Sequence, residues 1–476
     1  MKEKNMYWII ITITLLILIT PLIIRSAAYE GLIPGENAYY HMRIAEYIKE
    51  NIKIPKNDPL ADRIYDYNPF HLLLAAAGYF PGVEFAGKII PLILGLSSMT
   101  FFYLILRELK IEEKKRFFIC LILMLSPIFI YTFSTISQFS LITFLNLLGF
   151  FFFIKQKKIF ITLSIITFAS IPYFNFFNAL VTLILLFSYT ISTKAERKKF
   201  YAVSLGITLR TLIYHFYIFY KFGLPQTPSF IKTSIIQNSI SDLGALIGFS
   251  FFTLVLALVG LIVTWKKKKE FYYIYIISII LIVSSLYFGD YTNIYLNFII
   301  VIMAGFGFFF LTDRKWQIKA IRNASLLLII CGIAFSMVSY IIRFSEMHPY
   351  PEEAESLRWL QQNSEQGDVV LSHYSNGFWI EYYAGRKALL DPHFDYINDL
   401  EQKYADSKTI FNSRSLDITT KLLDANKIRY IWINKPMKEG LIWKEEDEGL
   451  LFLFSDREKF MQAYSNGEAE IWEYLG

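Results

Sequence analysis

The hydrophobic residues of this chain lie in long continuous blocks, not at the spacing that marks one face of an amphipathic helix. Blocks of roughly 17–25 apolar residues are typical of helices that cross a membrane. Eleven blocks reach or approach this length, at about residues 7–25, 84–106, 116–134, 139–154, 159–172, 176–193, 200–221, 243–264, 271–288, 291–311 and 320–343. The pattern predicts an α-helical polytopic membrane protein with about eleven spans.

Positive charge alternates along the connectors between these blocks. Every second connector carries a cluster of lysine and arginine: Lys2 and Lys4, Arg107 to Arg116, Lys155 to Lys158, Lys194 to Lys199, Lys266 to Lys269 and Arg314 to Lys319. Because basic loops stay in the cytoplasm, this alternation predicts a cytoplasmic N-terminus and, after an odd number of spans, an extracytoplasmic C-terminus. We expect the protein in the cell membrane.

One apolar segment does not fit the alternation. Asn68 to Phe80 has 13 residues, and counting it as a span would move the Arg107 to Arg116 cluster to the outside. We therefore predict that it is an interfacial helix within a first external loop, residues 29–83.

The last 133 residues differ in composition from the rest. Residues 344–476 contain 14 Lys and Arg against 24 Asp and Glu, a net charge of −10, whereas residues 1–343 carry +16. We predict a membrane domain, 1–343, and an extracytoplasmic soluble α/β domain, 344–476. Its expected helices are 351–362 and 417–426, and its expected strands are 368–372, 428–434, 449–454 and 468–473.

Composition excludes several classes of function. The chain is 54% hydrophobic and 18% aromatic, and it shows no phosphate-binding glycine loop, dinucleotide fingerprint or zinc spacing. Both cysteines, Cys120 and Cys331, fall in predicted spans, so no disulfide is expected in the exported domain. No nucleic-acid partner is expected.

Polar motifs gather in the segments predicted to be external. The first loop begins with GENAYYHMR from Gly35 to Arg43, a later loop ends with SISD at Ser239 to Asp242, and the exported domain carries SHYSNGFWIEYYAGR from Ser372 to Arg386. The last stretch resembles the WWDYG region of the oligosaccharyltransferase catalytic subunit. The order of motifs is similar to that family and, more broadly, to the GT-C glycosyltransferases.

This resemblance implies a glycosyltransferase that takes its sugar from a polyprenyl-phosphate or polyprenyl-diphosphate carrier at the external membrane face. Glu36 and Asp242 would be the catalytic carboxylates and the ligands of Mg²⁺ or Mn²⁺, and Asn37, His41 and Arg43 would contact the carrier's phosphate. The tail motif would face the acceptor, a protein or lipid; its members are His373, Tyr374, Ser375, Asn376, Gly377 and Arg386.

Other interpretations stay open at this point. The turn where the family has a second acidic motif reads TISQFS from Thr135 to Ser140, and Asp290 lies where the family has an arginine. The alternative is therefore a non-catalytic paralogue that binds lipid-linked glycan or assists a true transferase. A transporter is a third candidate.

Single residues also have structural alternatives. Glu36 could be a solvated residue near a helix end, and Asp242 could cap the eighth span. Arg386 and Asp391 could pair with each other to hold a loop of the exported domain.

Overall fold

The computed structural model describes residues 3–155, 157–193, 197–223, 239–265, 268–288, 291–395, 397, 399–445 and 447–476. All eleven predicted blocks correspond to helices within these ranges. The helices are α1 (Glu3–Ala28), α4 (Val83–Glu108), α5 (Glu113–Met124), α6 (Pro127–Ser134), α7 (Gln138–Ile154), α8 (Lys158–Ala169), α9 (Phe176–Thr193), α10 (Arg197–Phe222), α12 (Phe251–Trp265), α13 (Lys268–Phe288), α14 (Thr292–Asp313) and α15 (Lys319–Ser345).

The helices differ in length, and the count of eleven spans stays a prediction. Within the described residues, α1, α4, α10, α14 and α15 are each long and apolar enough to cross a membrane alone. Helices α5 and α6 pass the same test only together, and they are bent by 64° at the break before Pro127. The other five predicted spans are shorter apolar helices.

The eighth predicted span begins later than its apolar pattern suggests. Residues 243–250 do not join the helix, because a short helical turn, η2 (Ser241–Leu243), is followed by Gly244 with a φ of 106°. Only glycine adopts this conformation without strain. Helix α12 therefore starts at Phe251 instead of near residue 243.

The first loop holds two helices, α2 (Asn37–Asn51) and α3 (Pro69–Ala77). The prediction of a short helix at 68–80 is confirmed. Asn68 caps it by accepting a hydrogen bond from the backbone N–H of Phe70 at 3.0 Å, and Pro69 takes the first helical position. Tyr79 and Phe80 follow it with exposed fractions of 65% and 93%, as expected of aromatic side chains at a membrane interface.

The C-terminal part contains a five-stranded sheet in the order β2-β1-β3-β5-β4. Strand β1 (Val369–Leu371) pairs in parallel with β2 (Lys387–Ala388) and β3 (Ile428–Asn434), while β5 (Ala469–Tyr474) runs antiparallel to β3 and β4 (Phe460–Ser465). Its longer helices are α16 (Pro351–Asn363), α18 (Leu400–Asn412) and α19 (Leu416–Ala425). The predicted helices and three of the four predicted strands of this part are present.

The predicted strand at 449–454 is wrong, because this segment forms a single helical turn, α20 (Leu450–Leu453). Its apolar run is compatible with either structure, but Leu450 and Leu453 are the buried members, and this spacing of three is helical. Gly449 permits the entry with a φ of 54° and lies so close to the carbonyl of Phe411 that a side chain would clash.

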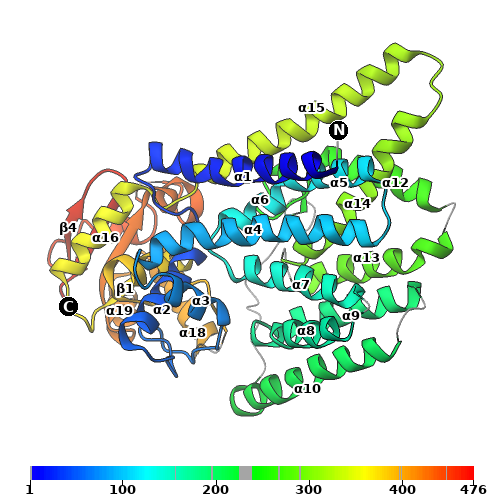
Figure 1. Ribbon diagram of the computed structural model, residues 1–476. Coiled ribbons are helices and arrows are strands. Elements are labelled where there is room, and N and C mark those ends of the chain that lie inside the picture. The colour runs from blue at the N-terminus through cyan, green and yellow to red at the C-terminus, as the bar shows by residue number, and fades with distance from the viewer. Residues whose placement is uncertain are drawn as a thin grey trace.

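The first loop and the C-terminal domain lie together at one end of helices α1, α4 and α15 (Figure 1). We call this end of the helices the tail-domain side. The main hydrophobic core runs through all three parts, since Tyr39 of the loop, Phe344 of α15 and Trp432 of β3 belong to it. A second core is confined to the C-terminal domain.

Arg25, near the end of α1, fixes the junction between the helices and the C-terminal domain. Its buried guanidinium donates to the carbonyl of Leu32 at 2.7 Å. It also donates to three carbonyls at and beyond the end of α15, those of Ser345 at 3.1 Å, Met347 at 2.8 Å and Pro349 at 2.8 Å. The C-terminal end of a helix favours a cation, so Arg25 suits this position.

Candidate active site

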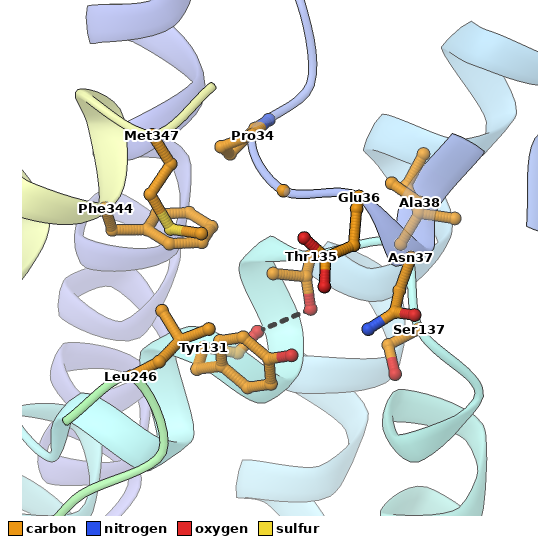
Figure 2. Close-up of a pocket in the computed structure, with 12 residues that line it drawn as sticks. Pro34, Glu36, Asn37, Ala38, Tyr131, Thr135, Ser137, Leu246, Phe344 and Met347 are labelled. Carbon is orange, nitrogen blue, oxygen red and sulfur yellow. Dashed lines mark hydrogen bonds between the residues drawn. The ribbon is translucent and has the colours of Figure 1, made fainter. Parts of the chain in front are cut away.

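A pocket of about 60 Å³ lies on the tail-domain side, where the first loop meets the ends of α6 and α15. Its lining residues are Pro34, Gly35, Glu36, Asn37, Ala38, Tyr131, Thr135, Ile136, Ser137, Leu246, Phe344 and Met347. We call it the Glu36 pocket, because Glu36 is the one carboxylate among these residues. Figure 2 shows the Glu36 carboxylate pointing into the pocket on the side of Thr135, with the Asn37 amide on the side of Ser137.

Glu36 combines a partly buried position with a carboxylate that makes no bond to any described residue. The backbone beside it is fixed, since Gly35 donates to the carbonyl of His348 at 2.8 Å and Tyr39 donates to the carbonyl of Glu36 at 3.0 Å. Burial raises the pKa of Glu36 from 4.5 to about 7. A carboxyl group with a pKa near neutral can accept and release a proton at physiological pH.

The turn after α6 lines the pocket. The family resemblance predicts a second acidic motif at this turn. The turn contributes Thr135, Ile136 and Ser137. The Thr135 hydroxyl donates to the Tyr131 carbonyl at 2.9 Å, and the Ser137 hydroxyl accepts from the backbone N–H of Phe139 at 3.3 Å. The turn therefore brings hydroxyl groups to the pocket where carboxylates are expected.

The tail motif lies near this pocket. Burial is the main reason why the pKa of Tyr374 is raised, and the charge of Glu36 contributes to the same shift. The ring of His373 lies against that of Tyr374, with the ring centres 4.2 Å apart and the planes tilted by 37°, and its Nδ1 lies 2.7 Å from the Ser375 hydroxyl. Burial lowers the pKa of His373 to about 4, so this histidine is neutral at physiological pH.

The remaining residues of the tail motif support its backbone. Asn376 donates to the Ser372 hydroxyl at 3.0 Å. Gly377 packs so closely on the backbone of Leu390 and Asp391 that a Cβ atom would lie 2.5 Å from the Leu390 carbonyl oxygen. Arg386 does not pair with Asp391 as one sequence interpretation proposed; it binds Ser364 and the carbonyls of Gln361 and Ala384.

The structure does not bring His41 to the Glu36 pocket. Its Nδ1 is hydrogen-bonded to His71 Nε2 at 2.8 Å, and His71 Nδ1 lies 2.8 Å from the Tyr65 hydroxyl. Burial lowers the pKa of His41 to about 3 and that of His71 as well, so both rings are neutral. This buried chain was not predicted, because His71 is 30 residues away in an apolar segment.

Arg43 is likewise inside the protein rather than at the pocket. It donates two hydrogen bonds to Asp58, at 2.7 and 2.9 Å, and one to Glu381 at 2.7 Å. Contact with a carrier phosphate, as the family resemblance implied, is therefore not supported for Arg43. Asp58 also accepts a hydrogen bond from Arg63 at 3.0 Å.

These ion pairs join the first loop to the C-terminal domain. Arg63 extends the network to Asp391, so two arginines face the three carboxylates of Asp58, Glu381 and Asp391. The network therefore contains one more carboxylate than guanidinium groups. Burial raises the pKa of Glu381 well above its usual range, although the charge of Arg43 opposes this shift.

Asp242 does not line the Glu36 pocket, and its carboxylate has a structural role. It accepts a hydrogen bond from the backbone N–H of Phe251, the first residue of α12, at 2.7 Å. The interpretation of Asp242 as a helix cap is thus supported. The neighbouring Ser241 is bound by Arg343 of α15, which donates to its carbonyl at 2.7 Å. Asp290 lies outside the described residues.

A divalent cation would find few protein ligands in the Glu36 pocket. In the part of the chain that the structure describes, no three His, Cys, Asp or Glu residues gather as a metal site. The pocket offers one unpartnered carboxylate, from Glu36, and the amide of Asn37. Mg²⁺ commonly binds one or two carboxylates and completes its shell with water and substrate phosphates, and this set suits that mode.

Comparison with known proteins places the architecture in a class. No protein-family model matches the sequence, and no curated protein matches it by sequence. Among solved structures, the apo oligosaccharyltransferase of Archaeoglobus fulgidus is similar, with a TM-score of 0.67 and 13% identity over 91% of this chain and 70% of that chain. ArnT from Cupriavidus metallidurans in the apo state has a TM-score of 0.61 and 10% identity over 98% of this chain and 97% of that chain.

The arabinofuranosyltransferase AftD from Mycobacteria is also similar, with a TM-score of 0.58 and 12% identity over 99% of this chain and 42% of that chain. These proteins are GT-C glycosyltransferases. The protein has the GT-C fold: apolar helices that indicate an integral membrane protein, with a small C-terminal sheet. Within this class its shape resembles both the archaeal oligosaccharyltransferase and ArnT.

Proposed function

We propose that the protein is a membrane glycosyltransferase that uses a sugar linked to a polyprenyl phosphate or diphosphate at the external membrane face. The observation that carries this proposal is the position of Glu36: unpaired, partly buried, in a pocket between the first loop and the helix ends of a GT-C fold. A structure of the archaeal oligosaccharyltransferase holds a dolichol-phosphate, and one of ArnT holds undecaprenyl phosphate. A fold alone does not define a reaction, so the residues of the pocket must carry the argument.

Glu36 suits the role of general base. The acceptor's nucleophile would attack the anomeric carbon of the sugar as the bond to the carrier phosphate breaks, and its proton would pass to the Glu36 carboxylate. A pKa of about 7 keeps much of the Glu36 side chain ionised at neutral pH and still makes it basic enough to take this proton. Tyr374 and His373 lie on the acceptor side in this proposal.

The cation would give the Glu36 carboxylate the alternative role of a metal ligand, because a bound Mg²⁺ or Mn²⁺ would remove the raised pKa that a general base needs. Glu36 and the Asn37 amide oxygen would hold Mg²⁺ or Mn²⁺, and the ion would offset negative charge on the carrier phosphate. Asp242 contributes no ligand in this arrangement, because it does not line the pocket and caps α12.

An apolar cavity within the helices is consistent with a lipid substrate. It has a volume of about 340 Å³ and lies between α4, α7, α9, α13 and α14. Cavities larger than a water molecule are uncommon in well-packed proteins, and apolar ones can take up apolar molecules. Part of a polyprenyl chain is an occupant of suitable chemistry.

The test is sugar release or transfer from a lipid-linked donor by purified protein in nanodiscs. We expect turnover by the wild type and a loss of about 10²-fold or more in Glu36→Gln, the range for removal of a general base. Asp242→Asn serves as the comparison, because a helix-cap residue outside the pocket should affect stability more than turnover. Absence of turnover, with donor binding unchanged in Glu36→Gln, would contradict the proposal.

The second candidate is a non-catalytic paralogue that binds lipid-linked glycan or assists a true transferase. The observation that favours it is the turn at Thr135 to Ser137, which brings hydroxyl groups to the pocket and no second carboxylate. Donor binding that is insensitive to chelator and to Glu36→Gln, without turnover, would support this candidate over the enzyme.

A further inference from the structure

Arg210 is a charged residue in the middle of α10, one of the helices long and apolar enough to cross a membrane. Its guanidinium lies 4.2 Å from the centre of the Tyr173 ring. No carboxylate, carbonyl or hydroxyl of the described chain accepts a hydrogen bond from it. A guanidinium has five N–H donors, and leaving them unmet in an apolar environment is costly. The described residues thus place an aromatic ring against the face of the Arg210 guanidinium and supply no acceptor for its N–H donors.

The depth of Arg210 in the membrane can be inferred from the residues that it contacts. Tyr173 belongs to η1 (Ile171–Tyr173), the turn between α8 and α9 on the tail-domain side. Five residues further along α10, His215 is hydrogen-bonded to the carbonyl of Pro172 at 2.7 Å. Arg210 is about 20 Å along α10 from Arg197, whereas the hydrocarbon layer is about 30 Å thick. Arg210 therefore lies in the leaflet on the tail-domain side, within about 10 Å of its headgroups.

Aromatic side chains hold this position. Tyr173 makes edge-on contacts with Tyr67 at 5.4 Å and Tyr214 at 5.3 Å, measured between ring centres. The Tyr214 hydroxyl donates to Asp66 at 2.8 Å, so this carboxylate is bound to a tyrosine and not to Arg210. The cluster fixes the arginine without neutralising it.

The surface beside Arg210 is apolar. Leu209, Ile213 and Phe216 of α10 have exposed fractions of 50%, 66% and 69%. A cation near the headgroups, next to an exposed apolar strip on the same helix, matches the two ends of a lipid molecule with a phosphate headgroup. Arginine is also the side chain best suited to bind phosphate through two parallel hydrogen bonds.

We propose that Arg210, positioned by Tyr173, binds the phosphate group of a membrane lipid in the leaflet on the tail-domain side. None of these residues lines the Glu36 pocket, so this is a second lipid site and does not depend on the proposed transferase reaction. Two lipids share the required chemistry: a polyprenyl phosphate and a phospholipid with an anionic headgroup.

The full chain in nanodiscs or mild detergent can be titrated with undecaprenyl phosphate, with phosphatidylglycerol and with inorganic phosphate, and bound lipid counted by native mass spectrometry. We expect Arg210→Gln to weaken lipid binding by about tenfold or more, in line with the loss of charge-assisted hydrogen bonds. The matched control is Lys221→Gln, which removes a cation from the exposed end of the same helix. Tyr173→Leu should weaken binding less, because it releases the guanidinium and keeps its charge.

Comparing the two lipids distinguishes a carrier-lipid site from a general phospholipid site. A loss confined to undecaprenyl phosphate assigns the site to the carrier, and an equal loss for both lipids assigns it to phosphate headgroups in general. Inorganic phosphate should compete poorly, because it lacks the apolar chain. Equal affinity of the wild type and Arg210→Gln for both lipids would overturn the proposal, as would an equal loss in Lys221→Gln. Glu36→Gln should retain this binding, so failure of the transferase proposal would be seen separately.

Discussion

Arg63 of the first loop binds Asp391 of the C-terminal domain, with one guanidinium nitrogen 2.6 and 2.7 Å from the two carboxylate oxygens. The two residues are 328 positions apart, and both are buried. The same guanidinium reaches Asp58, which Arg43 also binds. The loop that carries Glu36 is thus attached to the C-terminal domain by charge as well as by hydrophobic contact.

Arg63→Met should destabilise the protein strongly. Removing one member of a buried ion pair leaves charge without compensation, and typical losses in free energy of unfolding are about 3–5 kcal/mol. Thermal unfolding in detergent measures the effect. Lys387→Met is the control, since Lys387 pairs with the exposed Asp62 and an exposed pair contributes about 0–1 kcal/mol. Equal losses in both variants would show that burial of the Arg63 network does not matter.

Arg25→Met should loosen the junction between α1 and the C-terminal domain. Its guanidinium serves four backbone carbonyls, and their loss should lower the free energy of unfolding by about 3 kcal/mol or more. Limited proteolysis should then cleave near residues 345–350 faster than in the wild type. Arg322→Met, which removes a partly exposed arginine at the other end of α15 bonded to Asn323, should leave this rate unchanged.

The pKa of Glu36 predicts opposite pH effects on activity and stability. Turnover should rise with pH and level off above an apparent pKa of about 7, because the ionised carboxylate acts as the base. The free energy of unfolding should instead fall as pH rises. A raised pKa means that the folded protein binds the proton more tightly, so this group's contribution is present at low pH and is lost as pH rises through 7.

Glu36→Gln tests the predicted pH dependence of stability. Above pH 7 it should stabilise the protein by about 1–2 kcal/mol after allowance for screening by solvent, and below pH 4.5 the difference should vanish. Thermal unfolding of both proteins across this pH range is the measurement. A variant that is less stable than the wild type at high pH would indicate that the Glu36 carboxylate has a stabilising partner.

Divalent cations should bind cooperatively with a lipid phosphate. Because the Glu36 pocket has one carboxylate, Mn²⁺ alone should bind weakly, and a polyprenyl phosphate should tighten it. Electron paramagnetic resonance of free Mn²⁺ reports both affinities, and Glu36→Gln should abolish the tightening. Strong Mn²⁺ binding without lipid would require ligands beyond those of the pocket.

The helices were predictable because membrane spans and amphipathic segments leave a local pattern in the sequence. The blocks at 7–25 and 320–343, the short helix at 68–80 and strands such as 428–434 all appear near their predicted positions. Position 449–454 failed because a short apolar run does not distinguish a strand from one helical turn.

The surroundings of the site were less predictable, because they depend on partners far apart in sequence. Nothing in the sequence near Arg43 indicates that it pairs with Glu381, 338 residues away. The burial of Arg43 could therefore not be predicted. Glu36, by contrast, follows directly after the first span, and its place in the first loop could be inferred from the motif order.

The ties between the first loop and residues 381–391 have a consequence for biosynthesis. A ribosome adds about 5–20 residues per second, so Glu381 and Asp391, the distant partners of Arg43 and Arg63, emerge roughly 15–70 s after the loop itself. During this time two arginines meant for a buried network remain in contact with solvent or the insertion machinery. The loop that bears Glu36 can thus reach its final conformation only at the end of translation, and a chain truncated before residue 391 should leave the Glu36 pocket unformed even if every helix has been inserted.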